Sequence, residues 1–185
     1  MQIERYSGKY DEEIRELILT IQNKEAKIDL SLAEQPDLLA IGESYQKSGG
    51  QFFLATENGK VIGTVGLMLK EKNCAVLKKF FIKKEFRSKR VGLALYRELL
   101  QYAKKAGVRH IILDTPSVAQ TSHRFYEKAG FHKIIAAELP VHYTYPDRDS
   151  ILYELNLEGI CKGNLLCKFI LFPFQKLLVN DERIW

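Results

Sequence analysis

The chain has 185 residues, of which 46% are hydrophobic and 28% are charged, with a formal net charge of +5. This length and apolar content suit one folded domain and exclude an intrinsically disordered chain. The mild basic excess does not by itself indicate a nucleic-acid partner, and no apolar run is long enough to span a bilayer. The three cysteines are scattered without metal-ligand spacing, so we expect a reducing, cytoplasmic setting and no metal.

The first half of the chain predicts two helices followed by three strands. Apolar residues recur at helical spacing over residues 10–22, and Pro36 suits the start of a second helix that ends near residue 48. Strands are expected at residues 51–56, 61–69 and 75–82. Asn58 and Gly59 give a strong hairpin signal between the first two of these strands.

The second half predicts alternating helices and strands. A long amphipathic helix is expected at residues 91–106, closed by Gly107, and a shorter one at residues 120–129. Strands are expected at residues 110–114, 131–139 and 151–157. Hairpins followed by this alternation predict an α/β fold, a mixed sheet with helices on both faces.

We expect one domain over residues 1–157 and a C-terminal extension over residues 158–185. The extension is strongly apolar between residues 165 and 179, although charged residues and a proline interrupt it. A helix on a membrane surface is one interpretation. A helix packed on the core, or on a partner subunit in a homodimer, is favoured because Phe169, Phe172 and Leu177 would otherwise be exposed.

The segment from Phe80 to Leu95 gives the strongest functional signal. An apolar strand runs into a basic turn with Arg87, Lys89 and Arg90, and a helix opens directly afterwards. The first turn of a helix has unpaired N–H groups and the positive end of the helix dipole. This order of elements therefore predicts a site for phosphate or pyrophosphate, with a solvated charged loop as the alternative.

Three segments together resemble the GNAT N-acetyltransferase superfamily over residues 10–157. Residues 77–82 resemble its central strand, residues 87–94 its acetyl-CoA motif Q/R-x-x-G-x-G/A, and residues 124–131 its late FYEKxGF motif. The resemblance implies a GNAT-like central mixed, mostly antiparallel sheet flanked by helices on both faces. Arg90 departs from the motif where the first glycine is usual. It would be tolerated there if its backbone stays in a right-handed turn, and otherwise it would strain the turn.

The resemblance also implies an acetyl-CoA-dependent N-acetyltransferase that transfers an acetyl group directly to a primary amine of a small molecule or peptide. Backbone groups of Phe81 and Ile82 would hold the cosubstrate and polarise its thioester carbonyl. Tyr126 is the expected catalytic residue, a proton donor to the departing thiolate, although packing against the sheet is the alternative. The expected cofactor-binding residues are Phe81, Ile82, Arg87, Ser88, Lys89, Arg90, Val91, Gly92, Leu93, Ala94 and Tyr126.

The sequence does not identify the general base, because Val76 replaces the glutamate that is frequent on the central strand of the family. Candidates are Glu71, Asp114, Glu138 and His142. The acceptor site is expected at residues 28–37 and 142–149. Two other functions stay open: a non-catalytic acetyl-CoA-binding regulatory module, and a nucleic-acid-binding domain, which the absence of aromatic interleaving disfavours.

Overall fold

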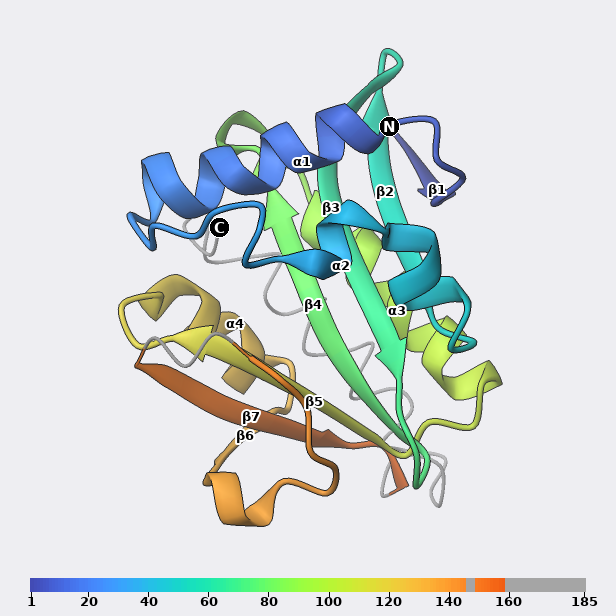
Figure 1. The fold of residues 1–185 in the computed structure, drawn as a ribbon, viewed down its shortest axis with the longest axis vertical. Helices are drawn as coiled ribbons and strands as arrows, with labels where there is room; N and C mark the ends of the chain where they lie inside the picture. The colour runs from blue at the N-terminus through green and yellow to red at the C-terminus, as the bar shows by residue number, and fades with distance from the viewer. Residues whose placement is uncertain (146–148, 159–185) are drawn as a thin grey trace.

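The computed structural model describes residues 1–145 and 149–158. Its strands are β1 Gln2–Arg5, β2 Gln51–Glu57, β3 Lys60–Leu69, β4 Cys74–Ile82, β5 His110–Pro116, β6 His132–Ile134 and β7 Ser150–Asn156. They form one seven-stranded sheet in the order β1-β2-β3-β4-β5-β7-β6 (Figure 1). The pairing of β4 with β5 is parallel, and the other five pairings are antiparallel.

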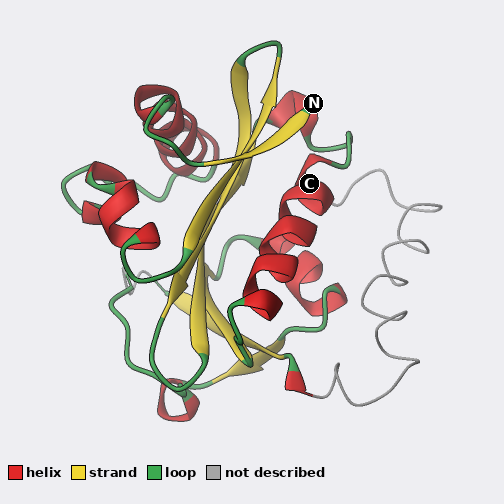
Figure 2. Cartoon of the chain, turned by 90° about the vertical axis from the view of Figure 1, so that its right-hand side faces the viewer, coloured by secondary structure: helices red, strands yellow, loops and turns green. Residues whose placement is uncertain are grey.

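Helices cover both faces of this sheet, as the edge-on view in Figure 2 shows. The helices are α1 Asp11–Leu19, α2 Pro36–Leu39, α3 Val91–Lys105 and α4 Gln120–Lys128. On one face α1 and α2 pack through an apolar cluster that includes Ile14, Leu38 and Phe52. On the other face α3 and α4 pack through a larger cluster that includes Leu95 and Phe125. The predicted mixed, mostly antiparallel sheet with helices on both faces is therefore confirmed.

Three local predictions differ from the structure. The strand β1 was not predicted, because four residues are too short a segment to show a period, and it forms by pairing with β2. The strand expected over residues 131–139 ends at Ile134, and a 3₁₀ turn at Ala136–Glu138 follows. The second helix is broken after Leu39, where Ala40 leaves the helical region with φ of −139°, and a π-helical turn follows at Gly42–Gln46.

The sheet opens between its two parallel strands. Only three residue pairs join β4 to β5, namely Cys74 with His110, Ala75 with Ile111 and Val76 with Ile112. Both strands continue beyond these pairs and diverge (Figure 1). We call the opening between residues 77–82 of β4 and residues 113–116 of β5 the fork. It exposes one edge of β4 that would otherwise be covered by a neighbouring strand.

A β-bulge lies in β4 beside the fork. Phe81 pairs with Thr64 and Lys78 pairs with Gly66, so Lys79 and Phe80 together oppose one residue of β3. Lys79 has a positive φ of 54°, and its carbonyl accepts the Thr64 hydroxyl at 2.7 Å. The bulge turns the Lys79 side chain toward the α1 and α2 face, while Phe80 packs among the α3 and α4 aromatic residues.

Within residues 1–145 and 149–158, no helix combines the length and hydropathy needed to cross a membrane. The C-terminal extension falls on residues 159–185, outside the described part of the chain. Its packing, and the domain boundary near residue 157, stay predictions.

Candidate active site

The start of α3 has the properties of an anion site. No side chain caps its first N–H groups, and its first turn contains no acidic residue. The first bond from within the helix to its cap runs from the Ala94 N–H to the Arg90 carbonyl at 3.1 Å. Gly92 is buried in this first turn. The N–H groups and the helix dipole at this end suit the phosphates of a nucleotide cofactor.

Arg90 does not adopt the right-handed turn in which the sequence analysis expected an arginine to be tolerated. Its φ is +61° and its ψ is 13°, which is the left-handed region and not a right-handed turn. The tight turn before it, in which the Lys89 N–H bonds to the Phe86 carbonyl at 3.1 Å, delivers the chain to α3 in this conformation. A residue with a Cβ in this region costs about 1 kcal/mol relative to glycine. Glycine is usual at this position of the motif, and it would adopt the same backbone conformation without that cost.

The side chains of the basic turn fall into two groups. Ser88, Lys89 and Arg90 are exposed beside the start of α3. Arg87 is half-buried, and its Nε donates to the Ile82 carbonyl at 3.0 Å while its guanidinium pairs with the Glu25 carboxylate. The structure thus brings Lys89 and Arg90 to the anion site. It shows Arg87 bracing the end of β4 against the segment after α1.

Tyr126 lies on α4 with its ring in the large apolar cluster and only 7% of its surface exposed. Phe125, Phe131 and Tyr153 surround it, with ring centroids 5.5 to 6.1 Å away. Burial raises the pKa of the Tyr126 hydroxyl, and the nearby carboxylate of Asp114 raises it further. The hydroxyl is therefore protonated at neutral pH, as a proton donor must be.

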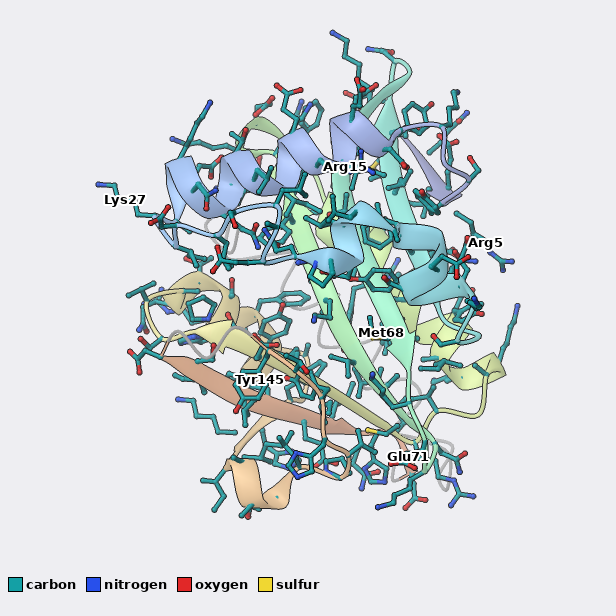
Figure 3. The ribbon with its side chains drawn as sticks, in the orientation of Figure 1. Arg5, Arg15, Lys27, Met68, Glu71 and Tyr145 are labelled. Carbon is teal, nitrogen blue, oxygen red and sulfur yellow. The ribbon has the colours of Figure 1, made fainter. Side chains whose placement is uncertain are left out.

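Of the four candidate bases, Asp114 is the one at the fork. Glu71 lies in the turn between β3 and β4, at the closed end of the fork (Figure 3). Glu138 is exposed and its carboxylate accepts the Ile135 N–H at 2.9 Å, which holds the 3₁₀ turn. His142 is exposed on the chain after that turn. These three residues lie in turns or on the surface, where a charged side chain needs no catalytic role. Asp114 differs from them because its carboxylate is half-buried.

The surroundings of Asp114 suit a base. The Tyr143 hydroxyl donates to its Oδ1 at 3.2 Å. Burial raises the pKa of the Asp114 carboxyl, and the charge of Lys78 and the Tyr143 hydrogen bond lower it in part. A carboxylate with a raised pKa accepts a proton more readily than an exposed one. Val76, at the position of the missing glutamate, is fully buried in an apolar cluster and can transfer no proton.

A buried polar network beside the fork was not indicated by the sequence. The Lys79 ammonium lies 2.6 Å from Gln35 Oε1 and 3.4 Å from Asp37 Oδ1. The Tyr45 hydroxyl donates to Asp37 Oδ2 at 2.6 Å, and the Gln22 and Gln35 side-chain amides exchange two hydrogen bonds. Burial lowers the pKa of Lys79, and the Asp37 carboxylate opposes this shift.

This network joins parts of the expected acceptor site to β4. Gln35 and Asp37 come from the connection that was expected to form that site, and the network fastens them to the bulge. Tyr143, from the second expected segment, lies on the other side of the fork, whereas residues 146–148 of that segment are outside the described part. No local pattern marks Lys79, because its partners are 42 and 44 residues away in sequence.

Comparison with known proteins gives a consistent result. The profile described as Acetyltransferase (GNAT) family matches residues 14–131. An acetyltransferase of the GNAT family from Staphylococcus aureus Mu50 has a TM-score of 0.82 and 35% identity, covering 85% of this chain and 99% of that one. An acetyltransferase from Streptococcus agalactiae 2603 has a TM-score of 0.81 and 39% identity, covering 84% and 98%.

The curated relatives are longer proteins. N-acetylaspartate synthetase of Mus musculus is 30% identical over 127 residues, which are 68% of this chain and 42% of that protein. The chain spans about half the length of the curated relatives it matches, between 41% and 58% for the first three. The family match over residues 14–131 contains β2 to β5, and so both strands that border the fork.

Proposed function

Because the chain belongs to the acetyltransferase (GNAT) family, we propose that it is an N-acetyltransferase that uses acetyl-CoA and transfers the acetyl group directly to an amine. One observation carries this proposal: where β4 and β5 part after three residue pairs, the half-buried carboxylate of Asp114 is close enough to the buried Tyr126 to raise the pKa of its hydroxyl. Beyond the fork, the chain passes from the end of β4 through the basic turn to the start of α3, which no side chain caps.

The residues around the fork fit acetyl-CoA. The first-turn N–H groups of α3, with Lys89 and Arg90, would bind its pyrophosphate. The edge of β4 beyond Val76 has no strand partner within the described ranges, so backbone groups near Phe81 and Ile82 can hold the pantetheine arm. When bound there, acetyl-CoA supplies an acyl thioester. A backbone N–H aimed at the thioester oxygen would stabilise the negative charge that develops on it.

Asp114 and Tyr126 carry the protons of the proposed reaction. Asp114 accepts the proton that an acceptor ammonium must lose before its nitrogen can attack. As the new C–N bond forms and the C–S bond breaks, Tyr126 donates its proton to the departing sulfur, and the second proton that the nitrogen loses passes to the resulting tyrosinate. A protonated Asp114 no longer opposes ionisation of Tyr126, so the first transfer makes the second easier. The two residues then re-equilibrate with solvent, and one proton is released per turnover.

A covalent acetyl-enzyme on Cys74 is disfavoured. This thiol is 1% exposed, and burial raises its pKa to about 11, so it is a thiol and not a thiolate at neutral pH. Cys161 and Cys167 lie outside the described residues. Direct transfer between two substrates bound together is therefore the mechanism that we propose.

A screen with acetyl-CoA and a panel of amines tests the proposal. The panel includes amino acids, amino-acid amides, polyamines, aminoglycosides and short peptides, and release of the CoA thiol is measured. We expect turnover with at least one amine and none with the Gly92→Glu variant. Binding of acetyl-CoA without turnover of any amine would instead indicate a non-catalytic regulatory module.

A further inference from the structure

Two opposite charges face each other across the mouth of the fork. The last paired residues of β4 and β5 are Val76 and Ile112, and two residues further along each strand lie Lys78 and Asp114. Side chains alternate between the faces of a strand. Val76 and Ile112 belong to one apolar cluster, so Lys78 and Asp114 lie on that same face, the one that also carries α1 and α2.

These two charges are not joined in an ion pair. Within residues 1–145 and 149–158, no carboxylate lies within 4 Å of the Lys78 ammonium. Lys78 is half-buried and lies two residues beyond the last pair on β4, as Asp114 does on β5, and its charge lowers the pKa of Asp114 in part. Divergence of the strands therefore holds a cation and a carboxylate apart, each with capacity to bind a group between them.

The neighbouring lysine, Lys79, already has partners within the protein. Lys79 is enclosed with Asp37 and Gln35, with only 8% of its side chain exposed. This leaves Lys78 as the cation on this face of β4 that can meet a ligand. Tyr143 occupies one position on Asp114, but a carboxylate has further lone pairs to accept an ammonium.

The surroundings of the two charges are apolar. Val76, Ile112 and Val141 form an apolar cluster below the two charges, with Met68 and Tyr143 packed against it. The segment fastened by Lys79 lies on the opposite side, and Figure 3 views this face with Met68 and Tyr145 labelled. Two opposite charges beside an apolar cluster suit a compact ligand that itself carries two opposite charges.

On the basis of the proposed function, we propose that the acceptor is a small amine that also carries a carboxylate, such as an amino acid, with its ammonium at Asp114 and its carboxylate at Lys78. Ammonium and carboxylate groups are each recognised by one charge-assisted hydrogen-bonding partner. A polyamine would place a second cation beside Lys78 and be repelled. Lys78 also disfavours the ammonium form of the bound amine, which assists its deprotonation.

The test compares amino acids with their amides, which keep the amine and lose the carboxylate. Steady-state rates are measured for the wild type, for Lys78→Gln, for the rescue variant Lys78→Arg and for Lys60→Gln, an exposed lysine in the hairpin far from the fork. We expect the wild type to prefer the acids by about 10-fold in kcat/KM. Lys78→Gln should remove this preference by raising the KM of the acids, while Lys78→Arg and Lys60→Gln keep it.

A series of glycine, β-alanine and γ-aminobutyrate then reports the spacing of the two charges. Equal or better use of amides and polyamines by the wild type would overturn the inference while leaving the proposed function intact. An equal loss for acids and amides in Lys78→Gln would overturn it too. Failure of every amine in the panel, with acetyl-CoA bound, would contradict the proposed function itself.

Discussion

The two sides of the fork are built in different ways. On the proposed cofactor side, the candidate anion site is formed by consecutive residues, from the basic turn through the first turn of α3. On the acceptor side, Lys78, Asp114 and Tyr143 come from three separate segments that meet only in the folded protein. The cofactor side can therefore be altered by one local change. The acceptor side depends on how β4 and β5 diverge and on how the Lys79 network holds the segment that contains Gln35 and Asp37.

The largest effect is expected for Gly92→Glu, which alters the cofactor side alone. A carboxylate and its added bulk in the first turn of α3 should weaken acetyl-CoA binding by about 1,000-fold, because both oppose an anionic ligand. Titration calorimetry with acetyl-CoA measures the change. Gln101→Glu, which adds the same charge at an exposed position of the same helix, serves as the matched control and should bind normally. Normal binding by Gly92→Glu would place the cofactor elsewhere.

Asp114→Asn should alter the acceptor side alone. We expect kcat/KM for the amine to fall by about 300-fold, within the range for loss of a general base, with unchanged acetyl-CoA affinity. The wild-type rate should rise with pH through the raised pKa of Asp114, which Lys78, Lys79, Tyr143 and Tyr126 surround, and the variant should lose this limb. Glu138→Gln is the control, and an equal loss there would argue against Asp114.

The same variant makes a stability prediction. A carboxyl with a raised pKa in the folded state stabilises the fold below its unfolded pKa, and this contribution is lost as pH rises through the folded pKa. Asp114→Asn removes that dependence. Its melting temperature relative to the wild type should therefore increase as pH rises from about 3.5, below the ordinary pKa of an aspartate, to neutral pH, and a constant difference would contradict the raised pKa.

Lys79→Met should remove the contacts that hold the segment containing Gln35 and Asp37 against β4. It leaves the Asp37 carboxylate buried without its cation, so the free energy of unfolding should fall by about 3 kcal/mol, a factor of about 150 in the unfolding equilibrium. Adding Asp37→Asn should recover part of that loss. Urea denaturation of both single variants and the double variant measures it, and additive losses would show that the two residues are not coupled.

Tyr126→Phe tests the proposed proton donor, whose hydroxyl is close enough to Asp114 for that carboxylate to raise its pKa. We expect kcat to fall by about 30-fold while acetyl-CoA affinity stays within about threefold. Tyr153→Phe, which removes a hydroxyl bonded to Glu127 in the same aromatic cluster, is the matched control. A loss of cofactor affinity without a change in kcat would make Tyr126 a packing residue.

The smallest effect is expected at Arg90. Arg90→Gly relieves the left-handed backbone and should raise the free energy of unfolding by about 1 kcal/mol, whereas Arg90→Ala keeps the strain and should not. Both variants lose the cation, so both should bind acetyl-CoA about threefold more weakly. Thermal unfolding of the two variants reports the backbone strain, and titration calorimetry with acetyl-CoA reports the loss of the charge. Equal stability of the two variants would contradict the strain.

The same contrast explains what the sequence could predict. The helix from Val91 and the basic turn before it are local, and their positions were predicted within a residue. The φ of Arg90 was not, because it depends on how the preceding turn meets the helix. Asp114 was one of four equal candidates until the register of β4 and β5 separated it from the others. The Lys79 network could not be predicted, since its partners meet only through tertiary packing.

The most direct measurement is an initial-rate study in which acetyl-CoA and the preferred amine of the panel are both varied. If the two substrates bind together on the two sides of the fork, the double-reciprocal lines intersect, and mass spectrometry finds no acetyl group on the protein after incubation with acetyl-CoA alone. Parallel lines, together with an acetylated protein that passes its acetyl group to the amine, would contradict direct transfer across the fork.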